Sequence, residues 1–166
     1  MKRKYVILIS IIILASFVFT TVIIVKEKCD GKNKYKDLSI NFEKLNSYFE
    51  ENGDFNLANM KDIDSSYIEN TLNIPMEKIN SYTGKIPIVN VNANMYIIIE
   101  AKEQENTNEI QEKLETFLVS YKKEWESFLL SEYDLLFESK VKVKGKYVYL
   151  IISENSKKLE DYISKN

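Results

Sequence analysis

The chain has 166 residues with 23 Lys or Arg, 25 Asp or Glu and no His, and its formal net charge is −2 at pH 7. From residue 29 onward it contains no Arg, 18 Lys and 24 acidic residues, which gives a net charge of −6. This balance makes nucleic acid a poor partner, and the lack of His removes the commonest general base and metal ligand. Cys29 is the only cysteine, which excludes an internal disulfide and a cysteine-based zinc site. We therefore expect no catalytic residue, no cofactor and no metal.

Residues 5–25 form an uncharged run that predicts a transmembrane helix. At 1.5 Å per residue such a helix spans about 31 Å, close to the ~30 Å hydrocarbon core of a bilayer. Lys2, Arg3 and Lys4 precede the run, and the positive-inside rule places them in the cytoplasm. The sequence thus predicts a single-pass protein of the cell membrane with its domain on the extracytoplasmic side. The alternative is a cleaved signal peptide, whose apolar region is usually only about 7–15 residues long.

The pattern divides the chain into three parts: residues 1–28 as cytoplasmic tip and anchor, 29–36 as a polar linker, and 37–166 as one extracytoplasmic domain. Apolar residues at helical spacing predict a first helix from Leu38, with Asp37 or Ser39 as N-cap.

That helix is expected to end at Gly53. A short second helix is expected at about residues 65–72, before a turn at Pro75.

The centre of the domain reads as strands followed by a long helix. Residues 79–91 predict an extended segment interrupted at Gly84, and residues 95–102 predict a strand with alternating faces. Asn106 is expected to cap the long helix, whose apolar stripe continues to Phe128.

The last part predicts a hairpin between residues 140–144 and 147–153, with Gly145 in its turn. Ser156 is expected to cap a final helix. The whole order predicts an α+β fold. We expect a small antiparallel sheet of three or four strands packed on one long helix, with shorter flanking helices.

Three segments resemble a bacterial family of domains of unknown function, the one numbered four-three-five-eight. They are residues 125–135 (WESFLLSEYDL), 144–148 (KGKYV) and 151–156 (IISENS). The family has approximately FESYLPEQYEL, KGNYV and VISEDA there. The resemblance covers residues 64–163 and implies a small membrane-anchored exported protein of a low-GC Gram-positive bacterium. It brings no activity, cofactor or catalytic residue.

The chain departs from this family in two places. Leu130 stands where the family has Pro, and Asn94 and Met95 stand where its strand often begins with an acidic pair. A function carried by that acidic pair would be lost here.

The many carboxylates are better explained as solvated helix faces than as a catalytic pair. Glu124 and Glu126 stand two residues apart, so their side chains diverge on a helix. Asp62 and Asp64 lack the spacing, the glycine and the closing Glu of a calcium loop.

Tyrosines indicate a candidate binding face on the sheet. Tyr147 and Tyr149 alternate with aliphatic residues that suit packing under the long helix, and Tyr96 joins them from a neighbouring strand. An open face of this kind would bind a glycan or an extended peptide. In the alternative, the helix that carries Phe42 and Phe49 covers this face and the rings are core.

Together these features favour a non-enzymatic, membrane-anchored module of the cell envelope that binds an envelope protein or a glycan. Two alternatives stay open: a hydrolase that uses carboxylates, and an accessory subunit of a membrane complex.

Overall fold

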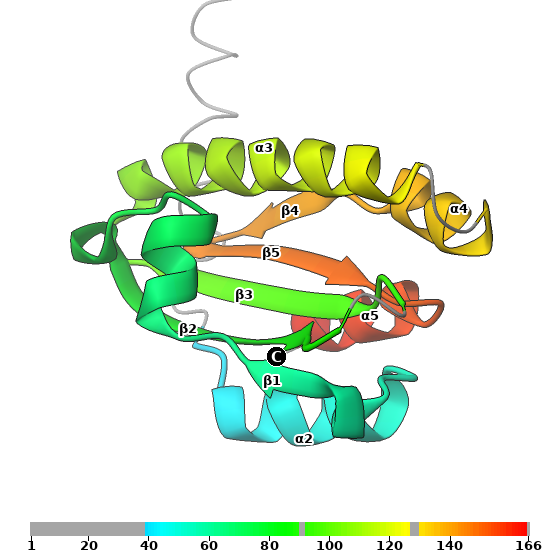
Figure 1. Cartoon of the computed structure of the whole chain (residues 1–166). Coiled ribbons are helices and arrows are strands. Elements are labelled where there is room, and N and C mark those ends of the chain that lie inside the picture. The colour runs from blue at the N-terminus through cyan, green and yellow to red at the C-terminus, as the bar shows by residue number, and fades with distance from the viewer. Residues whose placement is uncertain (1–38, 90–91, 127–129, 166) are drawn as a thin grey trace, which may run out of the picture. The chain divides into compact units, whose positions relative to one another are not determined.

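Five antiparallel strands form the centre of the fold in this computed structural model, in the order β1-β2-β3-β5-β4 (Figure 1). The structure describes residues 39–89, 92–126 and 130–165. The α+β class is confirmed, but the sheet has five strands rather than three or four. They are β1 (Met60–Asp62), β2 (Ile79–Pro87), β3 (Met95–Ala101), β4 (Val141–Lys144) and β5 (Tyr147–Ile152).

Strand β1 is the strand that the sequence pattern missed. It has three residues and pairs with β2 from Met60↔Pro87 to Asp62↔Lys85, so it is too short to show a period of two. The expected interruption of β2 at Gly84 is also wrong, because β2 runs through this residue and pairs it with Ile97. A Cβ atom at Gly84 would lie 2.4 Å from the Tyr96 carbonyl oxygen, so glycine permits the close approach of β2 and β3.

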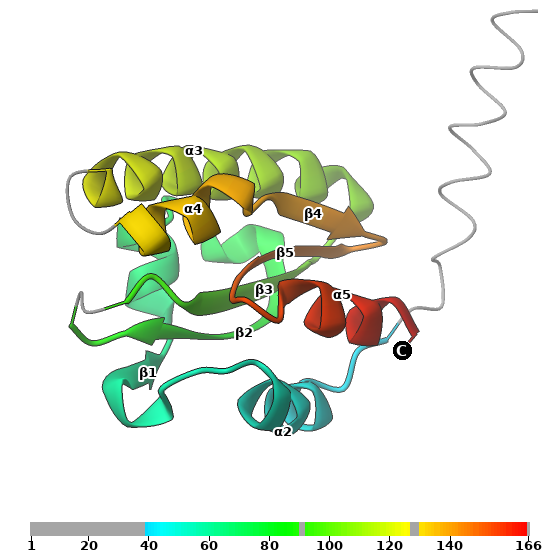
Figure 2. The ribbon, with the colours of Figure 1, turned by 90° about the vertical axis from the view of Figure 1, so that its right-hand side faces the viewer.

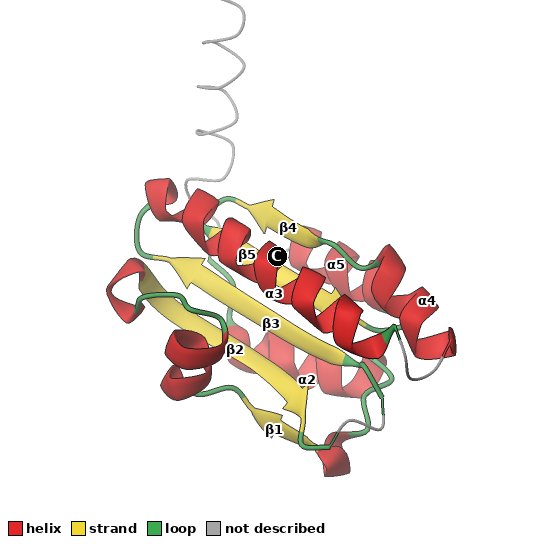
Figure 3. Ribbon diagram, turned by 45° about the horizontal axis from the view of Figure 1, so that its top comes forward, coloured by secondary structure: helices red, strands yellow, loops and turns green. Residues whose placement is uncertain are grey.

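Helix α3 (Thr107–Trp125) lies across one face of the sheet, and α4 (Leu130–Glu138) lies beside its end (Figure 3). The predicted stripe of α3 is buried, with Trp125 2% exposed, except at Phe117, which is half-buried. Three alternate residues of β5 pack in the same core cluster, as the predicted alternation requires: Val148, Leu150 and Ile152.

Helices α2 (Phe42–Asn52) and α5 (Ser156–Lys165) cover the opposite face of the sheet (Figure 2). Phe49 of α2 is fully buried there, and so are Leu159 and Ile163 of α5. Because helices lie on both faces, every residue of β5 is buried. The predicted hairpin is confirmed, and Gly145 in its turn has a φ of 58°, which favours glycine.

The helix starts differ from the expected caps. The side chain of Asn41, not Ser39, caps α2 by accepting a hydrogen bond from the Lys44 amide at 3.0 Å, and Asp37 lies outside the described residues. Asn106 precedes α3 but makes no side-chain cap to it. Its amide oxygen instead accepts from the Glu103 amide at 3.1 Å, within a capping box around the 3-10 turn Gln104–Asn106.

The predicted transmembrane run, residues 5–25, and the linker, 29–36, lie outside the described residues, as does Phe128. Within residues 39–89, 92–126 and 130–165, no helix is long and apolar enough to cross a membrane. The anchor and its orientation therefore stay predictions.

Candidate functional site

The tyrosines of the predicted binding face lie in the core. Tyr96, Tyr147 and Tyr149 are 0%, 2% and 5% exposed, in the cluster that α2 and α5 cover. The structure therefore agrees with the alternative, in which helices cover this face of the sheet and the tyrosine rings are core. The physical reason is that the apolar sides of α2 and α5 also need burial, and this face receives them.

Two of these hydroxyl groups have partners inside the fold. The Tyr147 hydroxyl accepts a hydrogen bond from the Ile40 amide at 3.0 Å, and the Tyr96 hydroxyl donates to Asn46 Oδ1 at 3.3 Å. Burial raises the pKa of both tyrosines above the usual value for a phenol. These groups stabilise the fold and present no surface to a ligand.

The carboxylates considered from the sequence do not converge. Asp62 pairs with Lys85 at 2.7 Å on the edge of the sheet, and Glu124 is exposed on α3. Within the described ranges, no three His, Cys, Asp or Glu side chains are placed to hold a metal ion together.

A cleft of about 300 Å³ lies between α3 and the π-helical turn Tyr67–Thr71, and we call it the π-turn cleft. The turn and the helix contribute residues far apart in sequence, which only the tertiary fold brings together. The lining consists of Thr71, Leu72, Asn73, Glu112, Lys113, Thr116, Phe117, Ser120, Tyr121 and Glu124.

Local hydrogen bonds build the π-helical wall of the cleft. Asp64 caps the turn by accepting from the Tyr67 amide at 2.7 Å, and the Leu72 amide closes the wide ring to the Tyr67 carbonyl at 3.1 Å. Asn73 then takes a φ of 55°, a left-handed conformation that Asn tolerates better than most residues. The Ile74 amide bonds back to the Ile68 carbonyl at 3.1 Å and ends the turn. This conformation sets Asn73 at the rim.

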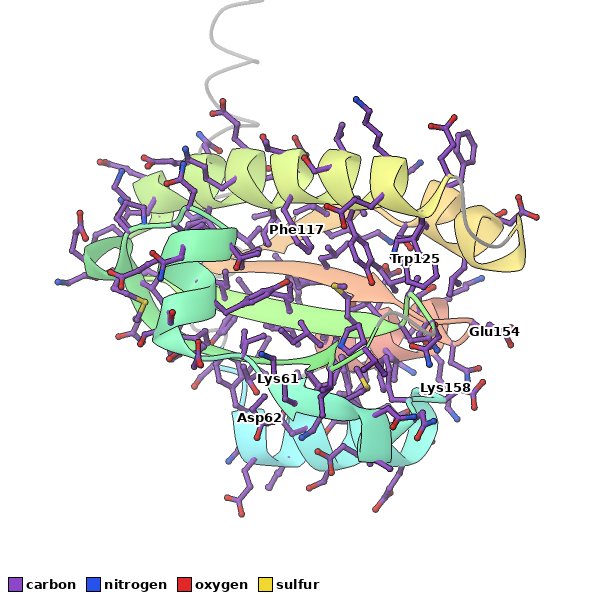
Figure 4. All side chains as sticks on the ribbon, viewed as in Figure 1. Lys61, Asp62, Phe117, Trp125, Glu154 and Lys158 are labelled. Carbon is purple, nitrogen blue, oxygen red and sulfur yellow. The ribbon has the colours of Figure 1, made fainter. Side chains whose placement is uncertain are left out.

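A row of aromatic rings runs along the inner side of α3 and forms the floor. Tyr67 meets Phe117 edge-on, with ring centroids 6.3 Å apart, and Phe117 stacks on Tyr121 at 5.6 Å. Tyr121 in turn meets Trp125 edge-on at 6.1 Å. Phe117 and Trp125 extend from α3 toward the sheet (Figure 4). Of these four rings, Phe117 and Tyr121 line the cleft and give it an aromatic floor.

The rim of the cleft is polar. Burial raises the pKa of Tyr67, with smaller contributions from the nearby Tyr121 hydroxyl and the Glu124 carboxylate. Two carboxylates, Glu112 and Glu124, and one ammonium group, Lys113, give the lining a formal charge of −1. Hydroxyl groups and the Asn73 amide add further hydrogen-bond donors and acceptors to the lining.

The π-turn cleft was not predicted, although two signals for it are present in the sequence. Asn73 stands two residues before Pro75 and marks a turn that ends a helix. Phe117 belongs to the apolar stripe predicted for α3, but the structure leaves it only half-buried. Neither signal shows that these two places face each other.

Two further hollows flank α5. This helix follows the turn at Glu154 and carries Lys158 (Figure 4). One lies between α2 and α5, beside the stacked rings of Tyr48 and Tyr162, whose centroids are 3.9 Å apart. The other lies between α4, β4 and α5, beside the ion pair of Lys142 with Glu160. Their volumes are about 440 and 560 Å³, and charged side chains line both.

Comparison with known proteins separates these three hollows. Searches of curated proteins and of solved structures each found no match. The family model described as a domain of unknown function, DUF4358, matches residues 51–153. All lining residues of the π-turn cleft fall inside this match, as do eight of the eleven that line the hollow between α4, β4 and α5, whereas none of those between α2 and α5 does. The chain belongs to the DUF4358 family.

Proposed function

We propose that this protein is a membrane-tethered module of the cell envelope that binds its ligand in the π-turn cleft. One observation carries this proposal: the entire lining of the cleft lies within the family match, at residues 51–153. A site that belongs to the family is expected within the part of the chain that defines it.

The tether is the uncharged run of residues 5–25, which has the length of a bilayer-spanning helix. The basic cluster at residues 2–4 supports a cytoplasmic N-terminus and an extracytoplasmic domain. Under this arrangement the protein is a single-pass membrane protein, and the linker at 29–36 joins the anchor to the domain.

The chemistry of the lining supports binding rather than catalysis. Its polar side chains are carboxylates, hydroxyls, an amide and one ammonium group, which are suited to orienting a polar ligand. The Thr116 hydroxyl donates to the Glu112 carbonyl oxygen at 2.8 Å within α3, so this hydroxyl is held by its own helix. An apolar floor with a polar rim is the usual composition of a ligand site.

Site-specific crosslinking in cells tests this function. A photoreactive residue at Ser120, in the cleft, is compared with one at Val119, which is 67% exposed and outside the lining. We expect an adduct from position 120 and none from position 119, in a membrane fraction that resists carbonate washing. Protease added to intact spheroplasts should digest the domain. Equal adducts at both positions, or release by carbonate, would contradict the proposal.

A further inference from the structure

We propose that the ligand of the π-turn cleft is a neutral saccharide chain. This inference rests on the proposed function, because it assigns a chemical class to the same site.

The first argument is the length of the cleft. Its lining along α3 extends from Glu112 to Glu124, which are twelve positions apart and therefore about 18 Å from each other at a rise of 1.5 Å per residue. The opposite wall ends at Asn73, beyond the π-helical turn. An elongated site of this length suits a short chain of repeated units better than one compact metabolite.

The second argument is the pairing of floor and rim. A sugar ring has an apolar face of C–H groups and a circumference of hydroxyl groups. The half-buried ring of Phe117 offers the cleft an apolar surface, while Ser120 and Asn73 are exposed along it as small donors and acceptors. The carboxylates of the lining accept hydrogen bonds from hydroxyl donors, and such bonds are stronger than those between neutral groups.

The third argument is charge. The lining has a formal charge of −1, and the chain from residue 29 onward has a net charge of −6. Both disfavour an anionic polymer such as a phosphate or uronate chain. An uncharged chain meets no such repulsion.

An extended peptide fits the site less well than a saccharide. Peptides that bind as strands add to a free sheet edge through their backbone groups. Both walls of the cleft are helical, and the backbone hydrogen bonds of the π-helical turn and of α3 close within each element. Neither wall is a strand with a free edge, which is what such a peptide requires.

The test uses the full chain in a detergent without a sugar headgroup. Trp125 is the only tryptophan and contacts Tyr121 of the lining, so its fluorescence reports occupation of the cleft. Neutral oligomers of glucose and of N-acetylglucosamine are titrated against galacturonate oligomers of equal length and against an uncharged extended peptide. Calorimetry gives the affinity independently of fluorescence. We expect at least one neutral series to bind, and galacturonate to bind about tenfold more weakly or not at all.

Two variants with a matched control locate the binding. Ser120→Phe fills the cleft and should weaken the affinity for the neutral oligomer by at least about tenfold. Val119→Phe adds the same ring one residue away, outside the lining, and should leave affinity unchanged. Asn73→Gly removes the rim amide but keeps the left-handed backbone, and it should weaken binding several-fold with little change in melting temperature.

The outcomes separate this inference from the proposed function. If no neutral saccharide binds while the crosslink at Ser120 forms, the saccharide class is wrong and the binding module stands. Preferred binding of the peptide or of galacturonate would overturn the saccharide class in the same way. Saccharide binding that Ser120→Phe leaves unchanged would place the sugar elsewhere and overturn the inference for this cleft.

Discussion

Phe49→Ala tests whether α2 is an essential layer of the domain, although α2 begins before the residues that the family model matches. Phe49 is fully buried and meets Tyr96 edge-on, with ring centroids 5.0 Å apart. Truncation of a fully buried Phe to Ala usually costs about 3–5 kcal/mol of unfolding free energy. The aromatic pair contributes about 0.5–1.5 kcal/mol of that loss, which a double-mutant cycle with Tyr96→Leu would isolate.

Phe137→Ala is the matched control, because it deletes the same ring from an exposed position. Phe137 is 66% exposed, and its ring centroid lies 5.9 Å from Lys122 Nζ. An exposed cation–π contact is worth about 0.5–1 kcal/mol, so the loss should stay below about 1 kcal/mol. Both substitutions remove equal apolar volume, and only burial distinguishes them.

The assay is urea unfolding of residues 37–166 at constant pH, followed by the fluorescence of Trp125. Trp125 packs in the core cluster on the other side of the sheet from Phe49, so its signal reports unfolding of the whole domain. We expect a large fall in the urea midpoint for Phe49→Ala at unchanged slope. Similar midpoints for the two variants would show that α2 does not cover the sheet and would refute this reasoning.

Three further predictions concern the sheet. Gly84→Ala should lower stability by about 1–3 kcal/mol in thermal unfolding, because its methyl group collides with the Tyr96 carbonyl oxygen. Tyr147→Phe should cost about 1–3 kcal/mol in urea unfolding, because the Ile40 amide loses its acceptor. Alkali should destabilise the domain above about pH 10. In the folded state burial raises the pKa of Tyr96, and the hydrogen bond from Lys85 to Asp62 raises the pKa of Lys85. Unchanged stability up to pH 12 would contradict the last prediction.

The sign of the alkaline prediction follows from proton binding. A group whose pKa is higher in the folded state keeps its proton to higher pH there than in the unfolded chain. Its stabilising contribution is complete below the unfolded pKa, about 10 for Tyr and 10.4 for Lys, and is lost as the pH rises through the folded value. Tyr96 and Lys85 therefore act in the same direction, while Lys122 and Lys144, whose pKa values are lowered by burial, act in the opposite direction.

Elements with a long periodic pattern could be predicted from the sequence. The stripe of α3 and the hairpin around Gly145 are confirmed, because each repeats its apolar residues at the period of its own backbone. The side of β5 that packs under α3 is also as predicted, since its residues are purely aliphatic. The α+β class follows from these elements alone.

Only the tertiary structure decided the remaining features. Strand β1 exists because β2 offers it a partner, and three residues contain no pattern that predicts this pairing. Tyr96 and Tyr147 are amphipathic, so their sequence positions suit a wet face or a core, and the packing of α2 and α5 settled the choice. The π-turn cleft joins Asn73 to Ser120 across 47 positions of sequence. Local propensity determines each helix by itself, but contact between two helical surfaces depends on the fold that places them together.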